Sequence, residues 1–357
     1  MTIQVAVMNG YGLAMASDRH VFRGSDARST GQEVKLLRLR GSVSAGMMAS
    51  GPFAVFGLPV SRLALRLERA LAGASRAPEA LAEAVLAAFS EKLEGPALDG
   101  DADLLAEVAA EIATRARSAA PDAAEGLRAV LAELERAPRV RDAETVEQAA
   151  RAAWEACASR LAGDSAALAP LLAAPDLSGR AVSGAFARDW RRAGDLFITV
   201  GLVCPATGVP VLIALRLWRG LGGRLHFVSR LDADYEASWR AGRTVVVAQG
   251  SGRPLVEAML DGLADDHWAA LPPAGRDSVR GGMDARWDRA HGRLGVAAPR
   301  ELAAIAAGLV RGAEVIGFLT REAEGTVAEV DSLCLTPREV LASTLPVSAP
   351  TRRAAAA

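Results

Sequence analysis

The order in which strand-like and helix-like segments follow one another constrains the fold more than any other feature of this sequence. Short apolar runs with a period of two predict strands, and leucines four residues apart predict helices. The strand-like runs are residues 3–7, 13–16, 34–39, 43–48, 196–203, 211–218, 225–228, 244–248, 315–319 and 327–335, and the helical runs include 63–71, 78–93, 254–263 and the segment from 299 onward. Strand hairpins that alternate with helix pairs indicate an α+β fold, in which two antiparallel sheets pack face to face and are covered by helices.

Residues 98–190 interrupt this pattern. They are rich in Ala, Glu and Arg and contain several amphipathic helices, whose apolar stripes we interpret as packing faces. Residues 265–297 are polar and irregular, and residues 340–357 are expected to be a flexible polar tail. The core then comprises residues 1–97 and 191–339. Without the irregular insertion it has about 213 residues, an ordinary size for one domain.

The composition and charge exclude several classes of protein. The 357 residues carry a net charge of −1, whereas nucleic-acid binding requires a basic surplus, so we expect no nucleic-acid partner. The three cysteines are far apart, which suits a reducing cytoplasm and predicts neither a disulfide framework nor a zinc site. The first residues lack the pattern of a signal peptide. The apolar stretch 196–215 has Gly and Pro in its middle, so it predicts two strands around a turn and no membrane segment.

Common nucleotide-binding and hydrolase motifs are missing from the sequence. It contains neither the phosphate-binding loop G-x-x-x-x-G-K-[ST] nor the dinucleotide fingerprint G-x-G-x-x-G. Residues 249–252 lack the first glycine of a nucleophile elbow. The four histidines show no metal-ligand spacing. We therefore expect no cofactor and no metal ion.

The N-terminus offers a different source of chemistry. A small second residue permits removal of Met1, after which Thr2 would carry a hydroxyl nucleophile and a free α-amine. An α-amine has a pKa of roughly 7.7–8.0 in model peptides, so it can act as the base for its own hydroxyl. Asp18 ends the second strand and Lys35 lies on the third, so both would converge on Thr2 if these strands pair beside the first. The ammonium would favour the alkoxide, and the carboxylate would orient the lysine.

Each of these residues also has an ordinary structural interpretation. Thr2 can be a strand residue behind a retained Met1, and Asp18 a turn residue at a strand end. Lys35 can be a charge at a sheet edge, although it is one of only two lysines in a chain whose usual cation is arginine. Ser251, which lies between two glycines before a helix, can be a helix N-cap.

The order of these motifs resembles that of proteasome β-subunits and of the bacterial heat-shock proteasome-like peptidase. In that family a Thr-led strand is followed by an Asp, a Lys and a glycine-containing turn into a helix. The matching segments here are TIQVAV at 2–7, GLAMASD at 12–18, KLLRL at 35–39 and SAGMMASG at 44–51. AQGSG at 248–252 is similar to the second signature of the family, a G-S-G turn. The resemblance covers roughly residues 1–95, 195–264 and 298–338.

The resemblance implies an αββα four-layer N-terminal-nucleophile hydrolase sandwich with an inserted helical subdomain. It implies that Thr2 is the nucleophile, that Asp18 orients Lys35, and that Lys35 tunes Thr2. It further implies that Ser251 supports the α-amine and that the backbone N–H near Ala49 forms the oxyanion hole, where a backbone donor stabilises the tetrahedral oxyanion.

Three features depart from the family pattern. The family usually has glycine where Ala49 and Ser50 stand. Its Asp-x-x-Ser motif before the C-terminal strands is missing, and Glu314 is the only nearby carboxylate. The 98–190 insertion is foreign to the family core and could supply an oligomer contact, a lid or an adaptor surface.

The leading functional hypothesis is a threonine-type hydrolase that cleaves peptide or amide bonds through an acyl-enzyme on Thr2, in a self-assembled homo-oligomer. Its substrate would be a peptide or a protein, and the sequence identifies no unfoldase or adaptor. Two alternatives remain open: a non-catalytic assembly or regulatory subunit of the same fold, and a hydrolase of small amides.

Overall fold

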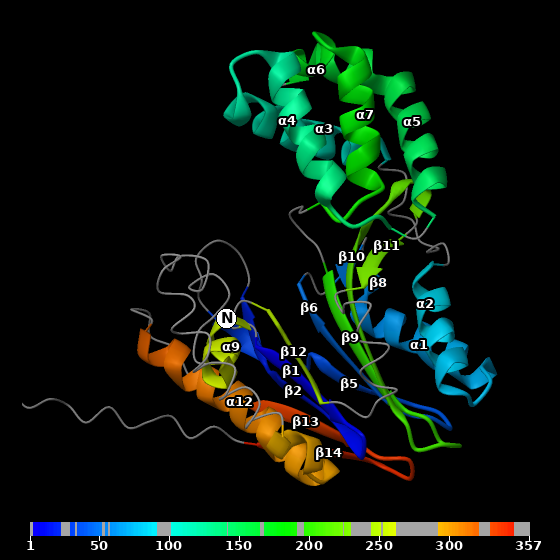
Figure 1. Ribbon diagram of the computed structural model, residues 1–357, viewed down its shortest axis with the longest axis vertical. Helices are drawn as coiled ribbons and strands as arrows, with labels where there is room; N and C mark the ends of the chain where they lie inside the picture. The colour runs from blue at the N-terminus through cyan, green and yellow to red at the C-terminus, as the bar shows by residue number, and fades with distance from the viewer. Residues whose placement is uncertain are drawn as a thin grey trace, which may run out of the picture.

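Two five-stranded antiparallel sheets pack face to face in the computed structural model (Figure 1). The structure describes residues 3–22, 29–32, 34–51, 54–55, 58–90, 101–140, 142–164, 168–190, 196–223, 225–229, 244–250, 253–261, 292–320 and 329–345. The first sheet has the order β12 (Val245–Gln249), β1 (Gln4–Asn9), β2 (Gly12–Asp18), β13 (Val330–Leu335) and β14 (Val340–Leu345). The second sheet has the order β11 (Leu225–Ser229), β10 (Pro210–Arg219), β9 (Leu196–Val203), β6 (Ser44–Ser50) and β5 (Leu36–Leu39).

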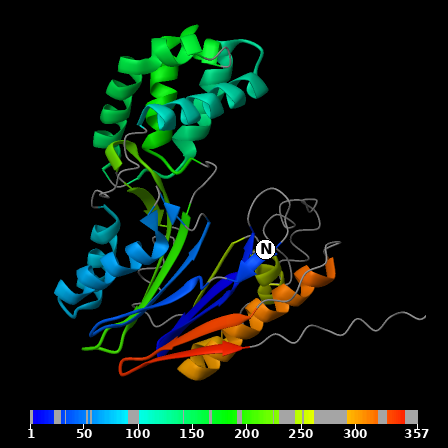
Figure 2. The ribbon, with the colours of Figure 1, turned by 180° about the vertical axis from the view of Figure 1, so that it is seen from behind.

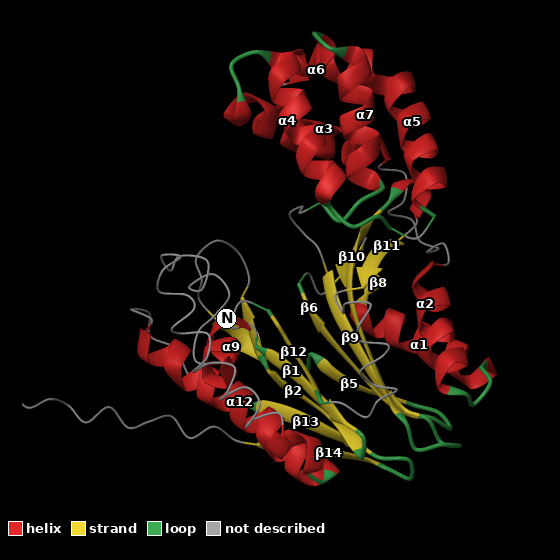
Figure 3. Ribbon diagram, viewed as in Figure 1, coloured by secondary structure: helices red, strands yellow, loops and turns green. Residues whose placement is uncertain are grey.

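Helices cover the outer face of each sheet, which confirms the predicted four-layer α+β architecture (Figure 3). Helices α1 (Val60–Gly73) and α2 (Pro78–Ser90) pack on the second sheet, and α9 (Arg253–Asp261) and α12 (Pro299–Thr320) pack on the first. The remaining short strands are β3 (His20–Phe22), β4 (Ser29–Gln32), β7 (Ala54–Val55) and β8 (Leu58–Pro59). They pair as β3 with β4 and β7 with β8.

The central strand β1 shows why the sequence folds into layers. All six of its residues are buried, because one face of the strand meets helices and the other meets the opposite sheet. Val5 and Val7 pack in the cluster that contains α12, whereas Ala6 and Met8 pack in the cluster between the sheets. A strand that is covered on both faces has a nearly continuous run of apolar residues in its sequence. Residues 5–8 of β1, which follow Gln4, form such a run.

The 98–190 segment folds around an apolar cluster of its own. Its helices are α3 (Asp101–Ala119), α4 (Ala123–Arg136), α5 (Ala143–Asp164), α6 (Ala169–Leu172) and α7 (Pro175–Phe186). They lie beyond the end of the second sheet at which β9 begins and β10 ends (Figures 1 and 2). The backbone N–H of Gly222, in the short helix η3 (Leu221–Gly223), donates to the Asp101 carboxylate, and Arg216 on β10 pairs with Asp189.

Three expectations about the elements need correction. Lys35 precedes β5, which belongs to the second sheet and does not pair beside β1. Residues 315–319 continue helix α12 and form no strand, because each added helical residue gains a hydrogen bond, which outweighs the weak strand preference of two β-branched residues. Residues 340–345 of the expected tail form β14, which completes the hydrogen bonding of β13.

Two further expectations fall largely or wholly outside the described residues. Of the 265–297 insertion, the structure describes only the segment from 292, which begins with a short helical turn. Residues 346–357 of the tail are outside the description. Within the described parts of the chain, no helix is both long and apolar enough to cross a membrane.

Candidate active site

A buried ion pair joins the two sheets near the start of the chain. The Nζ atom of Lys35 lies 3.0 Å from Oδ2 of Asp18, and the side chains are 1% and 0% exposed. Asp18 is the last residue of β2 in the first sheet, and Lys35 immediately precedes β5 in the second. A buried lysine is rare unless it is paired, so this pair sets the site apart from the surface charges elsewhere in the chain.

Asp18 also holds the backbone directly beside the predicted nucleophile. Its Oδ1 accepts a hydrogen bond of 2.6 Å from the N–H of Ile3, and its own N–H donates to the carbonyl of Ile3 over 3.1 Å. One carboxylate therefore binds both the Lys35 ammonium and the residue that follows Thr2. Thr2 itself lies outside the described residues, and so does Ser251.

The predicted oxyanion donor is already engaged. The N–H of Ala49 donates to the carbonyl oxygen of Lys35 over 3.1 Å, which extends the pairing of β5 with β6 by one step. This bond fixes the main chain of Lys35 to β6, so the lysine is positioned by both its backbone and its side chain. In this conformation the Ala49 N–H is not available to a substrate. The next residue, Ser50, is 4% exposed, and its Oγ has no hydrogen-bond partner within the described part of the chain.

A buried polar network lies between the sheets, and we did not predict it from the sequence. The Gln4 side-chain amide donates to the carbonyl of Ala49 over 2.7 Å and to Ser17 Oγ over 3.2 Å, and it accepts from the Gln249 amide. Gln249 in turn accepts from the Thr199 hydroxyl over 3.0 Å. The network links β1, β2 and β12 of the first sheet with β6 and β9 of the second.

The sequence did contain a signal for this network. Gln4 and Gln249 interrupt otherwise apolar strands, and a polar side chain at an interior position requires a partner there. The period-two alternation places Gln4 on the same strand face as Ala6 and Met8, which pack between the sheets. That pattern could have identified Gln4 as an interior polar residue, although not its partners.

Arg19, the residue after Asp18, anchors the end of β2 to its neighbours. It makes two hydrogen bonds of 2.7 Å to the Asp331 carboxylate and one of 2.8 Å to Glu329. The hydrogen bond from Asp331 raises the pKa of Arg19 above its usual value, and burial opposes the shift. The position of Glu314 on α12 is described, but that of its side chain is not, so no contact supports a role for it.

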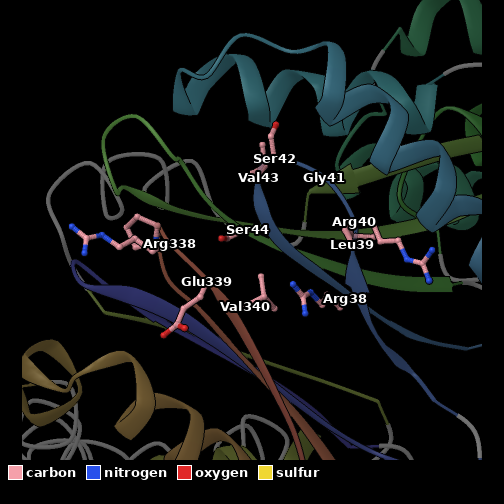
Figure 4. A pocket seen from close by; sticks show the side chains of 11 residues that line it. Arg38, Leu39, Arg40, Gly41, Ser42, Val43, Ser44, Arg338, Glu339 and Val340 are labelled. Carbon is pink, nitrogen blue, oxygen red and sulfur yellow. The ribbon is translucent and has the colours of Figure 1, made fainter.

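Nothing in the described residues indicates a metal centre: they contain no cluster of three or more His, Cys, Asp or Glu side chains that could hold a metal ion. A cavity of about 600 Å³ lies at the turns after β5 and β13, at the opposite ends of these strands from Lys35 and Asp18. Arg38, Arg40 and Arg338 line it, but the guanidinium groups of Arg40 and Arg338 point to opposite sides (Figure 4). The arrangement therefore does not form a convergent anion site.

Comparisons with known proteins give a weak likeness of fold. The chain matches no protein-family model and no curated protein. Among solved structures, it is similar to a Gly-1 mutant of Anbu from Hyphomicrobium sp. strain MC1, with a TM-score of 0.34 and 11% identity over 99% of this chain and 89% of that one. It is also similar to Anbu, an ancestral beta-subunit, from Yersinia bercovieri, with a TM-score of 0.31 and 10% identity over 97% of this chain and 88% of that one. At these values the likeness carries no weight for function, which has to be inferred from the residues.

Proposed function

We propose that this chain is a threonine-type N-terminal-nucleophile hydrolase that cleaves peptide or amide bonds. The observation that supports this most is the Asp18 carboxylate, which binds the buried Lys35 ammonium through one oxygen and the Ile3 N–H through the other. The Asp18 carboxylate thereby holds the Lys35 ammonium and the backbone of Ile3, and the residue before Ile3 in the sequence, Thr2, carries a hydroxyl and, once Met1 is removed, an α-amine.

The proposed reaction has two steps. In the first, the Thr2 α-amine takes the hydroxyl proton as Oγ attacks the carbonyl carbon of the substrate. The tetrahedral intermediate then expels the amine of the substrate, which receives that proton from the Thr2 α-amine as it leaves. An ester between the acyl group and Thr2 remains. In the second step, water adds to the ester carbonyl carbon while the Thr2 α-amine takes its proton. The bond between that carbon and Oγ then breaks, the α-amine returns the proton to Oγ, and the carboxylic acid is released.

Lys35 and Asp18 have separate parts in this scheme. The positive charge of Lys35 would favour the developing alkoxide and keep the α-amine neutral, because a second positive charge nearby disfavours protonation. Asp18 fixes the ammonium in place and offsets the cost of burying it. In our proposal Ser251, which lies in the sequence between β12 and α9, supports the α-amine.

The test is an intact-mass measurement on the purified protein before and after treatment with a β-lactone, which acylates an activated hydroxyl. We expect the mature mass to lack Met1 and the treated protein to gain one lactone, located at Thr2 by peptide mapping. Thr2→Ala is the matched control and should gain none. Retention of Met1, or a wild type that never reacts at Thr2, would contradict the proposal and favour a non-catalytic assembly or regulatory subunit.

A substrate panel then separates two forms of the proposal. We propose a peptide or protein substrate, so fluorogenic peptides should be hydrolysed faster than small acyl-amides. The reverse order would identify a hydrolase of small amides. The resemblance also leads us to propose a homo-oligomer, which light scattering coupled to gel filtration would detect as a mass several times that of one chain.

A further inference from the structure

The Ser50 hydroxyl is a buried polar group without an assigned partner. Ser50 is the last residue of β6 and is 4% exposed. Its Oγ makes no hydrogen bond within the described residues. Nearly all buried polar side-chain atoms in proteins have a hydrogen-bond partner, so an exception requires an explanation. One explanation is that the atom belongs to a binding site, where a ligand supplies the missing partner.

Alternation along β6 places this hydroxyl in the space between the sheets. Ala45, Met47 and Ala49 pack in the cluster with α1 and α2, whereas Met48 packs in the cluster between the sheets. Because strand side chains alternate, Ser50 lies on the same face as Met48.

The peptide unit before Ser50 is tied to the strand that begins beside the proposed nucleophile. Gln4 Nε2 donates to the carbonyl of Ala49 over 2.7 Å, and Gln4 is two residues from Thr2 in the sequence. Gly51 follows Ser50 with a φ of 117°, a backbone conformation that favours glycine, so the chain turns away directly after this residue. Ser50 is thus held at the strand end, opposite the start of β1.

We infer that the Ser50 hydroxyl contacts the substrate and donates a hydrogen bond to the oxygen of the scissile carbonyl. The Ala49 N–H, the oxyanion donor expected from the sequence, is bonded to the carbonyl of Lys35. A serine hydroxyl supplies one donor and can rotate to meet a developing oxyanion. This inference rests on the proposed function, because it assigns Ser50 to the same acylation step.

The test compares the rate of β-lactone acylation in variants of the full chain. We expect Ser50→Ala to lower the rate about 100-fold, the scale of losing one oxyanion donor. Ser50→Thr retains the hydroxyl and should stay within several-fold of the wild type. Ser44→Ala, at the other end of β6, is the matched control and should react at the wild-type rate. The urea midpoint of Ser50→Ala should equal or exceed that of the wild type, because the variant removes a buried hydroxyl without a partner.

Three results would overturn the inference. The first is a Ser50→Ala variant that reacts as fast as the wild type while Thr2→Ala does not react, which leaves the proposed function intact. The second is a rate loss in Ser50→Ala that only matches its unfolded fraction in urea titrations, which indicates a structural role. The third is a wild type that does not react at Thr2, which removes the proposed function and this inference together.

Discussion

Lys35 Nζ lies 3.0 Å from Asp18 Oδ2, although the two residues belong to opposite sheets. Lys35 immediately precedes β5 of the second sheet, and Asp18 is the last residue of β2 in the first. Both side chains are almost completely buried, so water contributes little to their solvation. A buried ion pair gains little net stability, because the cost of removing two charges from water offsets their attraction. The pair is therefore better explained by the chemistry that a buried ammonium can perform than by its contribution to folding.

The first prediction concerns the kind of cation at position 35. Lys35→Arg keeps the charge, but a planar guanidinium is larger than an ammonium and cannot take its place beside Asp18 without displacing its neighbours. We expect β-lactone acylation of Thr2 to fall at least about tenfold, on the scale of about 1.4 kcal/mol per factor of ten. Lys92→Arg, at the only other lysine, is the control. Wild-type rates in Lys35→Arg would show that the ammonium has no specific role.

The second prediction concerns the stability of the same pair. Asp18→Asn leaves the Lys35 ammonium buried without its carboxylate, which should lower the free energy of unfolding by about 3–5 kcal/mol. The double variant Asp18→Leu with Lys35→Met removes both charges, so it should be more stable than Asp18→Asn. Urea unfolding curves measure all three proteins. Equal losses in the single and the double variant would mean that the two charges do not interact.

The layered fold follows from local patterns, whereas the site depends on contacts that no local pattern specifies. Alternation and leucine spacing predicted most of the strands and helices and the two sheets, but they wrongly predicted a strand at 315–319 and placed β14 in the tail. They placed Asp18 correctly at a strand end, but they could not assign the strand after Lys35 to the second sheet, because sheet membership depends on pairing between distant segments. For the same reason, the hydrogen bond from the Ala49 N–H to the Lys35 carbonyl could not be foreseen.

The third prediction concerns the polar network between the sheets. Gln249→Leu removes the acceptor of the Thr199 hydroxyl and the donor to the side-chain oxygen Oε1 of Gln4, and it leaves both groups buried. We expect the free energy of unfolding to fall by about 1–3 kcal/mol, the cost of an unsatisfied buried group. Gln148→Leu, on the exposed surface of α5, should change it by less than about 0.5 kcal/mol. Equal effects of the two changes would show that the network does not stabilise the fold.

The fourth prediction concerns the anchor of β2. Arg19 donates hydrogen bonds to both oxygens of the Asp331 carboxylate and one to Glu329. A lysine has a single ammonium group and cannot reproduce this bidentate geometry. Arg19→Lys should therefore lower the free energy of unfolding by about 1–2 kcal/mol, somewhat less than a fully buried charged hydrogen bond contributes. Arg128→Lys, on the exposed face of α4, should be neutral. An unchanged unfolding midpoint in Arg19→Lys would show that the contacts are individually weak.

The fifth prediction concerns the thiol of Cys334 on β13. Burial is the main cause that raises its pKa above the ordinary value, Glu339 adds to the shift, and Arg300 opposes it. The unfolded chain loses this proton at a lower pH than the folded chain does. The folded state therefore binds more protons above the ordinary thiol pKa, and the stability that this thiol contributes decreases as the pH rises through that range.

Cys334→Ala isolates this effect, because alanine does not titrate. We expect the wild type to lose more stability than Cys334→Ala between neutral pH and pH 10, as measured by urea unfolding at each pH. In the native wild type, iodoacetamide should label Cys334 far more slowly than in urea, because only the exposed thiolate reacts. Rapid native labelling, or identical pH slopes in the two proteins, would show that the thiol is accessible and titrates normally in the folded chain.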